Sequence, residues 1–317
     1  MKKKAISVKN LNYTHPDGTK ALEDASLEVY EGERIAIVGP NGAGKTTFLL
    51  HLNGILRGSD GQVEVFGKSV DKEKKEELIK EVGIVFQDPD DQLFMPTVFD
   101  DIAFGPINMG LKEDKVRERV EKTILSLGLM GYENRCPHHL SSGEKKKASL
   151  ATVMSMEPRI LVLDEPTANL DPKSRAELIK IVNNLNEREG ITVIMATHDV
   201  NAVPAFADRV FVLNKKVIAE GTAQEIFSDG AMMKANNLEV PEVFKLFEML
   251  RCFGYNCKEL PLLMDEAIEH LTRTAEVNGG HIHLHIHEHT HDEIKKLKSK
   301  YEHRIMGQTE EKAMKVM

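Results

Sequence analysis

The chain contains 317 residues, 41% hydrophobic and 29% charged, and carries a formal net charge of −8. This length predicts two domains, or one large α/β domain with an appendage, and the composition excludes a mostly disordered chain. The acidic balance argues against nucleic acid as a partner, because proteins that bind it usually carry a basic surplus.

The cysteines and the lengths of the apolar runs indicate the kind of cellular compartment in which the protein works. Cys136, Cys252 and Cys257 are odd in number and scattered, which argues against a disulfide framework and favours a reducing environment. No apolar stretch follows the basic start Met1–Lys4, so export is not expected. No run reaches the roughly 18 apolar residues that span a bilayer. Any work at a membrane is therefore expected from its water side.

Four short apolar runs each lead into residues of chemical interest. They are Ile35–Val38 before Gly39, Val82–Phe86 before Gln87, Ile160–Leu163 before Asp164 and Glu165, and Ile191–Met195 before Ala196, Thr197 and His198. Unbroken runs of this kind are typical of strands covered on both faces, and hence of a parallel sheet. Ligands bind beyond the carboxyl ends of such strands. A plain strand end would explain one of these positions, but four together predict one shared site.

Helical patterns fill the intervals between these runs and continue beyond them. We expect helices over 112–127, from Ser141 onward and over 172–186, and then two amphipathic helices over 241–253 and 261–274. Asp171 and Pro172 are typical of a helix start. The character of the chain changes after about Gly221, and from Asp292 it is a charged, Lys-rich helix or tail.

Residues 39–46 fit the phosphate-binding loop pattern G-x-x-x-x-G-K-[ST] between a strand and a helix. Gly42 and Gly44 let successive backbone N–H groups point at phosphate oxygens, and the following helix adds the positive end of its dipole. Lys45 supplies charge to the β- and γ-phosphates, and the Thr46 hydroxyl is a Mg²⁺ ligand. The expected nucleotide contacts are Gly39, Pro40, Asn41, Gly42, Ala43, Gly44, Lys45, Thr46 and Thr47.

Two further segments are expected to act on that nucleotide. Asp164 is placed to hold Mg²⁺ directly or through water, and Glu165 to polarise an attacking water. Leu140–Glu144 can be interpreted as a capping box, with Ser141 and Glu144 three residues apart, or as an anion site at a helix start. Both interpretations are compatible, since the cap only creates the helix start.

Together these residues resemble the ATPase subunits of ATP-binding-cassette (ABC) transporters, over residues 1 to about 221. The resemblance also covers Gln87 (glutamine loop), Leu140–Glu144 (signature), 169–171 (D-loop) and His198 (switch histidine), and Tyr13 resembles the residue that stacks on adenine. It implies a P-loop NTPase core with a parallel sheet, and a helical subdomain at about 90–157 that carries the signature. It further implies ATP and Mg²⁺, with Glu165, His198 and Gln87 as catalytic residues, Thr46, Gln87 and Asp164 as Mg²⁺ ligands, and Ser141, Ser142 and Gly143 as nucleotide contacts.

Two segments narrow the resemblance to energy-coupling-factor importers, which take up vitamins or transition metals. Phe86–Phe94 is similar to the extended glutamine loop of that group, although a polar turn between strand and helix is the alternative. Leu260–Ala267 is similar to its carboxy-terminal extension. We therefore expect an ATPase domain over 1–221 and a small α+β accessory or dimerisation domain over 222–317.

Six histidines alternate with other residues near the end of the chain. They are His281, His283, His285, His287, His289 and His291. A strand would place all six on one face, about 6.6 Å apart at Cα, so that neighbouring imidazoles could converge on one ion. Neutral imidazole suits Ni²⁺, Co²⁺, Cu²⁺ or Zn²⁺. The alternative is a half-buried edge strand whose polar face happens to be histidine.

The sequence thus predicts an ATPase that forms a head-to-tail homo- or heterodimer with a second ATPase subunit. It would lie peripherally on the cytoplasmic face of the cell membrane, bound to integral-membrane coupling and substrate-binding proteins. The predicted cargo is cobalt or nickel, and a vitamin is the main alternative. A non-enzymatic metal chaperone would leave the phosphate motifs unused. A translation ABC protein usually carries two cassettes, and a chromosome-maintenance ATPase needs a longer interval than that between Thr46 and Leu140.

Overall fold

The structure is a computed structural model that describes residues 3–57, 60–255, 257–277, 282, 284 and 290–301. The chain divides into two compact units, 1–223 and 224–317, which are described separately.

A six-stranded sheet forms the centre of the first unit, in the order β10-β9-β3-β8-β7-β6. Its strands are β3 (Arg34–Val38), β6 (Val82–Val85), β7 (Ile160–Asp164), β8 (Thr192–Thr197), β9 (Arg209–Asn214) and β10 (Lys216–Gly221). All neighbours are parallel except β9 and β10. Every residue of β6, β7 and β8 is buried, as expected of strands covered on both faces. The four predicted strands and their parallel arrangement are confirmed.

The register of this sheet brings the predicted strand ends together. Val38 pairs with Thr197, Asp164 with Ala196, and Val85 with Leu163. The residues that follow these strands therefore emerge along one edge.

Ion pairs hold the opposite, amino-terminal edge of the same sheet. Arg34 Nη2 lies 2.8 Å from Asp208 Oδ1, joining the start of β3 to the residue before β9. Arg209 Nη1 lies 2.7 Å from Glu33 Oε2. These pairs connect the beginnings of neighbouring strands, at the edge of the sheet opposite the strand ends that carry the predicted site.

A second, antiparallel sheet has the order β2-β1-β4-β5. It contains β1 (Lys4–Thr14), β2 (Lys20–Tyr30), β4 (Asp60–Val65) and β5 (Lys68–Ser69). One hydrophobic core joins it to the central sheet through α1 (Lys45–Leu52), where Phe48 and Leu52 are fully buried. α2 (Lys75–Glu81) leads into β6.

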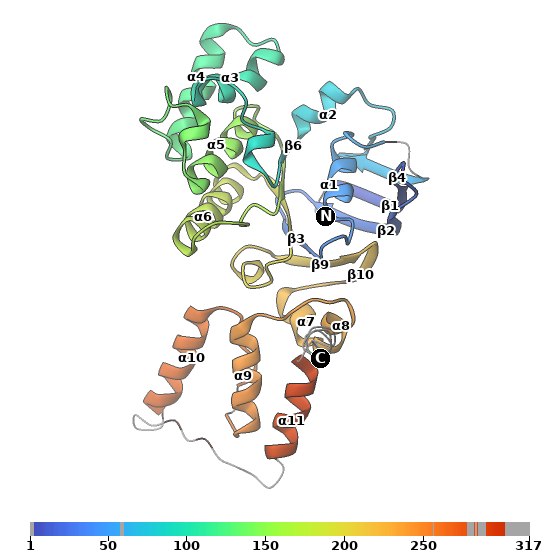
Figure 1. Ribbon diagram of the computed structural model, residues 1–317, viewed down its shortest axis with the longest axis vertical. Coiled ribbons are helices and arrows are strands. Elements are labelled where there is room, and N and C mark those ends of the chain that lie inside the picture. The colour runs from blue at the N-terminus through green and yellow to red at the C-terminus, as the bar shows by residue number, and fades with distance from the viewer. Residues whose placement is uncertain are drawn as a thin grey trace, which may run out of the picture. The chain divides into compact units, whose positions relative to one another are not determined.

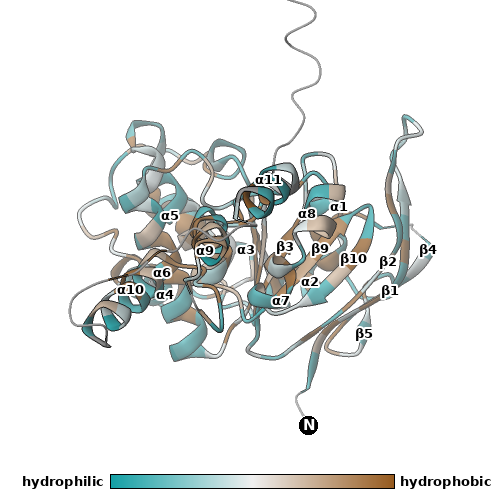
Figure 2. Ribbon diagram, turned by 90° about the horizontal axis from the view of Figure 1, so that it is seen from below, coloured by the Kyte–Doolittle hydropathy of each residue, from teal (hydrophilic) through white to brown (hydrophobic). Residues whose placement is uncertain are grey.

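Helices form a separate layer on the first unit (Figure 1). They are α3 (Val98–Asn108), α4 (Glu113–Ser126), α5 (Ser142–Met154) and α6 (Pro172–Glu189), with short 3-10 helices at Pro89–Asp91, Pro137–His139 and Val203–Ala205. Asp171 caps α6 by accepting from the backbone N–H groups of Lys173 and Ser174, as predicted. A second core lies among these helices and the central sheet, and Figure 2 shows the central strands coloured largely as hydrophobic.

The described part of the second unit is helical. Its elements are α7 (Ala223–Ser228), which begins at the boundary, α8 (Gly230–Ala235), α9 (Glu242–Cys252), α10 (Met264–Val277) and α11 (Thr290–Tyr301). α9 and α10 correspond to the two amphipathic helices predicted there. Phe247 of α9 meets Tyr255 edge-on at 5.7 Å, and the Tyr255 hydroxyl lies 2.9 Å from Thr274 Oγ1 of α10.

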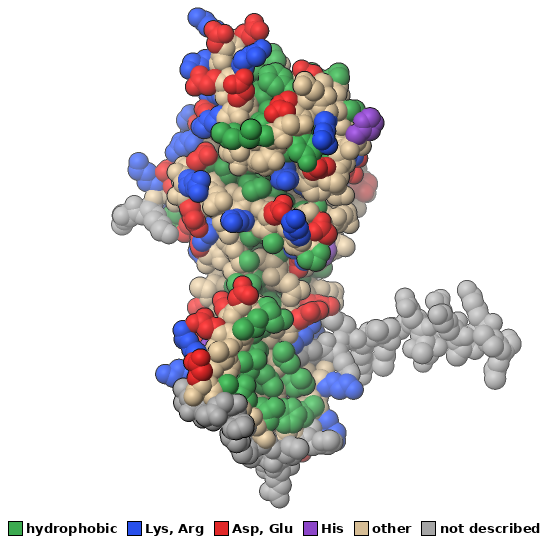
Figure 3. Space-filling view, turned by 90° about the vertical axis from the view of Figure 1, so that its left-hand side faces the viewer, with side chains coloured by type: hydrophobic (Ala, Val, Ile, Leu, Met, Phe, Trp, Pro, Cys, Tyr) green, Lys and Arg blue, Asp and Glu red, His purple; other side chains and the backbone are tan. Residues whose placement is uncertain are grey.

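Hydrophobic side chains gather on the surface of the second unit (Figure 3). The large exposed ones in its helices are Leu246 and Met249 of α9, and Met264 and Ile268 of α10, and Ile282 and Leu284 are also exposed. The dimerisation role expected of this region stays a prediction.

The predicted histidine strand differs from the structure at its end. His281, His283, His285, His287 and His289 lie outside the described residues. The helix α11 already begins at Thr290, so the backbone of His291 is helical and the strand cannot extend that far. Asp292 and Glu293 in the first turn favour a helix start there, because acidic residues complement the helix dipole.

Candidate nucleotide site

A phosphate-binding loop connects β3 to α1. Gly42 and Gly44 have φ angles of 78° and 90°, in the left-handed region that favours glycine. A Cβ atom on Gly44 would lie 2.3 Å from the Ala21 carbonyl oxygen, and one on Gly39 equally close to that of Leu213. The loop therefore needs glycine for its backbone angles and for its close contact with neighbouring strands.

The loop borders a cavity of about 330 Å³ at the carboxyl edge of the sheet. It is lined by His15, Thr19, Lys20, Ala21, Asn41, Gly42, Ala43, Gly44, Lys45, Thr46, Thr47, Gln87, Asp164 and Glu165. The structure thus gathers the loop, Gln87 and the acidic pair around one space. Gly39 and Pro40 contribute through their carbonyl groups, which accept hydrogen bonds from Lys45 Nζ at 2.7 and 3.2 Å.

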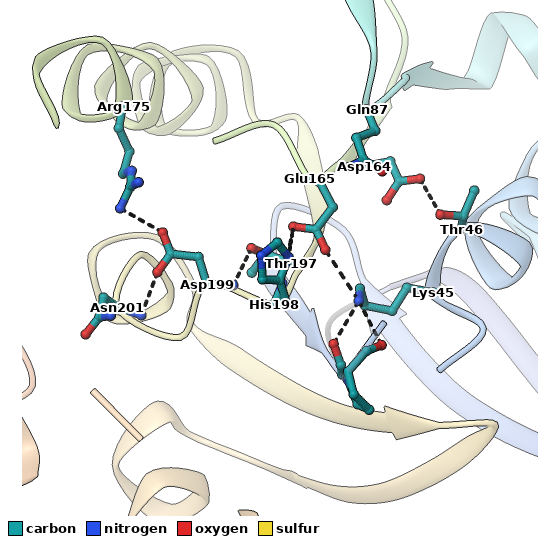
Figure 4. Close-up of polar contacts among 12 residues, drawn as sticks. Lys45, Thr46, Gln87, Asp164, Glu165, Arg175, Thr197, His198, Asp199 and Asn201 are labelled. Atoms are coloured by element: carbon teal, nitrogen blue, oxygen red, sulfur yellow. Dashed lines mark hydrogen bonds and ion pairs between the residues drawn. The ribbon is translucent and has the colours of Figure 1, made fainter. Parts of the chain in front are cut away.

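Thr46 and Asp164 form a direct hydrogen bond. Thr46 Oγ1 donates to Asp164 Oδ2 at 2.6 Å, while Asp164 Oδ1 is buried and has no hydrogen-bond partner among the described residues. Burial raises the pKa of Asp164, and the hydrogen bond from Thr46 opposes that shift. A hydroxyl and a carboxylate with a spare oxygen suit Mg²⁺, which prefers oxygen ligands. Gln87 adds an amide oxygen from the same cavity wall (Figure 4).

Glu165 lies between two nitrogen groups. Its Oε1 is 3.4 Å from Lys45 Nζ and its Oε2 is 2.9 Å from His198 Nδ1, and Oε2 also accepts the His198 backbone N–H (Figure 4). Glu165 directly follows β7 and has a φ angle of 44°. This left-handed turn directs a nearly buried carboxylate back over the loop. Glu165 and His198, predicted from different strand ends, therefore meet.

His198 sits in a turn that other residues hold. Thr197 Oγ1 accepts the Asp199 backbone N–H at 3.0 Å. Arg175 Nη1 of α6 lies 2.8 Å from Asp199 Oδ2. These contacts connect the turn that carries His198 to the helix that follows the D-loop.

The signature segment starts α5 and faces elsewhere. Ser141 accepts the Glu144 backbone N–H, and Glu144 accepts that of Ser141, so the capping-box interpretation is confirmed. Ser141 and Ser142 are exposed, and neither they nor Gly143 line the cavity of the described residues. Glu144, which replaces the commoner glutamine, is occupied by this cap.

Two residues near the nucleotide cavity, His15 and Lys146, were not predicted from the sequence. The Tyr13 ring meets His51 edge-on at 4.8 Å and does not line the cavity, whereas His15 lines it and lies 3.4 Å from Thr47 Oγ1. The sequence offered one indication of His15, namely that it lies two residues after Tyr13, the predicted adenine contact. The other candidate is Lys146 of α5, whose side chain is buried beside the acidic pair.

Comparisons with known proteins agree with this geometry. A family model described as ABC transporter matches residues 22–168. The energy-coupling factor transporter ATP-binding protein EcfA of Methanothermobacter thermautotrophicus is 50% identical over 84% of this chain and 86% of its own length. The chain belongs to this family of ABC transporter ATPases. EcfA of Methanocaldococcus jannaschii is 46% identical over 77% of this chain and 88% of its own.

Solved structures support the same assignment. CbiO1 of Clostridium perfringens, described as part of the ABC transporter complex cbiONQ, is 40% identical with a TM-score of 0.67. It covers 78% of this chain and 99% of its own. A dimeric ATP-binding cassette bound to ADP and phosphate is 26% identical with a TM-score of 0.62, over 69% of this chain and 98% of its own. The family member described here is thus an energy-coupling-factor type ATPase that uses ATP and Mg²⁺ and couples hydrolysis to transport.

The predicted transition-metal site at the alternating histidines stays a prediction. Among the described residues, no three His, Cys, Asp or Glu side chains gather as a metal site, and five of the six alternating histidines lie outside that set. Within the described residues, none of the helices has the length and hydropathy needed to cross a bilayer.

Proposed function

We propose that this ATPase energises an importer by hydrolysing ATP at the site built around Glu165. The observation that carries this proposal is the Glu165 carboxylate, held between Lys45 and His198 beside the Thr46–Asp164 pair. Lys45 binds the β- and γ-phosphates and the loop N–H groups orient them. Thr46, Asp164 and Gln87 would hold Mg²⁺, which would neutralise phosphate charge when bound.

Glu165 acts as the general base in this scheme. Its carboxylate accepts a proton from the attacking water as the water oxygen bonds to the γ-phosphorus and the bond to ADP breaks. His198 positions the carboxylate through the 2.9 Å contact from Nδ1. His15, rather than Tyr13, contacts the nucleotide beyond Thr47, since its ring lies on the cavity wall.

A second ATPase subunit completes each site. Ser141, Ser142 and Gly143 lie at the N-terminus of a 13-residue helix, where unpaired N–H groups attract anions. Because they do not line their own cavity, we assign them to the γ-phosphate bound by the partner subunit. The dimeric relative bound to ADP and phosphate supports this arrangement.

A groove in the first unit is suited to a membrane partner. It has a volume of about 380 Å³, and its lining comes from α2, β6, α3, α5 and the segments beside them, with apolar side chains such as Phe86, Phe94 and Met156. Phe94 and Phe104 meet edge-on at 5.0 Å on its wall and are 60% and 42% exposed. Exposed aromatic rings in a groove are typical of protein-binding sites.

Asp101 gives this groove its charge preference. Its Oδ1 accepts the backbone N–H groups of Phe94 and Met95 at 3.0 Å each, while Oδ2 is buried without a hydrogen-bond partner in the described structure. An arginine or lysine entering the groove would satisfy that oxygen. We therefore propose that an amphipathic helix of the membrane coupling protein docks here, with one basic residue directed at Asp101. Gln92, which also lines the groove, connects this place to the glutamine loop.

The proposed cargo is a cobalt or nickel ion, and the alternating histidines of the sequence support it. Import of a vitamin is the second candidate, because the energy-coupling-factor relatives carry no cargo in their names.

Uptake by vesicles tests both levels of the proposal. The chain would be co-expressed with the membrane proteins encoded beside it, and the complex reconstituted with ATP on the side of the ATPase. We expect ATP-dependent uptake of labelled Co²⁺ or Ni²⁺. Uptake of a vitamin alone would refute the cargo, and failure to co-purify with any membrane protein would refute the transporter role.

A further inference from the structure

Lys146 is a buried lysine that the mechanism above does not use. It lies in the second turn of α5 and is only 4% exposed. Burial lowers its pKa, and the nearby carboxylates of Asp88, Asp164 and Glu165 oppose that shift. A buried ammonium is unfavourable unless it is hydrogen-bonded and balanced by charge. The burial of Lys146 beside Asp164 and Glu165 therefore needs contacts that compensate it.

The ammonium contacts the backbone of two residues from the nucleotide cavity. Lys146 Nζ donates to the Gln87 carbonyl oxygen at 2.5 Å and approaches that of Glu165 at 3.5 Å. Gln87 follows β6 and Glu165 follows β7, so one side chain reaches the ends of two adjacent strands. The Glu165 backbone has a φ angle of 44°, which persists in a non-glycine residue only where surrounding contacts hold it.

Further bonds fix the loop after Gln87 to the same helix. Lys145 Nζ lies 2.7 Å from Asp90 Oδ1. Gln92 Nε2 donates to Ser149 O at 2.8 Å and to Thr152 Oγ1 at 2.6 Å. Gln92 also lines the apolar groove, so the groove wall and the loop are both attached to α5.

We propose that Lys146 is a positioning residue that holds the Gln87 and Glu165 backbones in register with α5. The helix carries the signature at its first turn and contributes to the groove further along. A shift of α5, from the partner subunit or from the groove, therefore reaches the general base through one ammonium group. This inference rests on the proposed function only in taking Glu165 as the base.

The test compares three variants in the assembled transporter and in the ATPase alone. Lys146→Met removes the donors and the charge at similar volume, and Lys146→Arg keeps both. Lys147→Met is the matched control, because Lys147 is the next residue, is partly exposed and pairs at 3.9 Å with the exposed Glu177. We measure kcat and KM for ATP hydrolysis, and nucleotide affinity of the isolated ATPase.

We expect Lys146→Met to lower kcat about 10- to 100-fold, the range in which misplacing a catalytic group acts. KM and nucleotide affinity should change less than about threefold, since the phosphate loop is intact. Lys146→Arg should recover most of the loss, and Lys147→Met should behave as wild type. A kcat of Lys146→Met within twofold of wild type would overturn the inference, as would a parallel loss of nucleotide affinity.

If Lys146→Met does not fold, Lys146→Gln and Lys146→Arg are compared instead. Lys146→Gln retains an amide donor without the charge, and its kcat is expected to be at least tenfold below that of Lys146→Arg. Equal kcat values would overturn the inference. The transporter role is judged separately by co-purification and uptake, so its failure would be distinguishable.

Discussion

The nucleotide edge of the first unit and the described helices of the second unit contrast in how they use polar groups. At the edge, Lys45, Glu165 and His198 follow three different strands, and Glu165 lies 3.4 Å from Lys45 and 2.9 Å from His198. In α9, the rings of Phe244 and Phe247 are buried, while leucine, methionine and isoleucine side chains of α9 and α10 are exposed. Parallel strands deliver their ends to one place whatever the loops between them do, and short helices give no such constraint.

The largest effect is expected from replacing Glu165, the proposed general base at the nucleotide edge. Glu165→Gln should lower ATP turnover by about 10²–10⁴-fold, because the amide cannot accept the proton from water. ATP binding should persist, and the dimer should accumulate in its ATP-bound form. Steady-state hydrolysis with the membrane partners present, together with nucleotide titration, gives both quantities. Near-normal turnover would show that another group is the base.

The signature segment should affect assembly rather than the protomer's own site. Ser141→Arg places a bulky side chain at the helix start and should strongly weaken ATP-driven dimerisation. Ser141→Ala loses the same cap, worth about 1 kcal/mol, without the bulk. Size-exclusion profiles with ATP and a Glu165→Gln background would compare the two. Loss of ATP binding in the isolated Ser141→Arg protomer would contradict the head-to-tail arrangement.

Removing the buried charge from the groove should weaken binding of the membrane partner without lowering the stability of the ATPase. Asp101→Asn keeps an oxygen for the N–H groups of Phe94 and Met95 but removes the charge directed at the partner. We expect weaker capture of the membrane protein and less stimulated hydrolysis, with a Tm at pH 7 no lower than wild type. Asp100→Asn is the control, because Asp100 precedes Asp101 in α3, is half-buried, and keeps an oxygen that can accept from Thr97 Oγ1. Normal capture by Asp101→Asn would place the docking site elsewhere.

The same variant has a signed pH dependence. Burial raises the pKa of Asp101 above its ordinary value of 3.8, so the folded state binds the proton more tightly than the unfolded state. Wild-type stability from this group therefore falls as pH rises from about 4 towards neutrality. The Tm of Asp101→Asn relative to wild type should rise over that interval. A constant difference between pH 4 and pH 7 would contradict the raised pKa.

The smallest effect on ATP turnover is expected from the histidine segment. Replacing all six alternating histidines by Asn should abolish uptake of Ni²⁺ at neutral pH. In the native chain, bound metal should be released as pH falls through about 6.5, because protons compete for imidazole. Calorimetric titration of both proteins with Ni²⁺ measures this. Equal uptake by both would move the metal to other residues.

Sequence reasoning succeeded where a local pattern determines geometry. The four apolar runs became parallel strands, and their ends brought the phosphate loop, Asp164, Glu165 and His198 together. The spacing of Ser141 and Glu144 correctly predicted the capping box. In each case neighbouring residues, or the rule that parallel strand ends share an edge, carried enough information.

It failed where the outcome depends on irregular backbone or on burial. Alternation alone cannot reveal the register shifts on either side of Tyr13 in β1, and the contact of Tyr13 with adenine stays a prediction. Lys145, Lys146 and Lys147 read alike as a charged run, and only the packing of α5 buries the second. Alternation likewise placed His291 in a strand, whereas its backbone belongs to the helix that begins at Thr290.

The ion pairs at the amino-terminal edge of the sheet offer protein engineers a separate handle. Arg34–Asp208 and Arg209–Glu33 connect strand beginnings, whereas every reacting group lies at strand ends. Heat tolerance can therefore be adjusted at one rim of the molecule while turnover is adjusted at the other. Changing these charges is expected to alter thermal stability modestly, because partly exposed ion pairs contribute about 0–1 kcal/mol each, and to leave the nucleotide site unchanged.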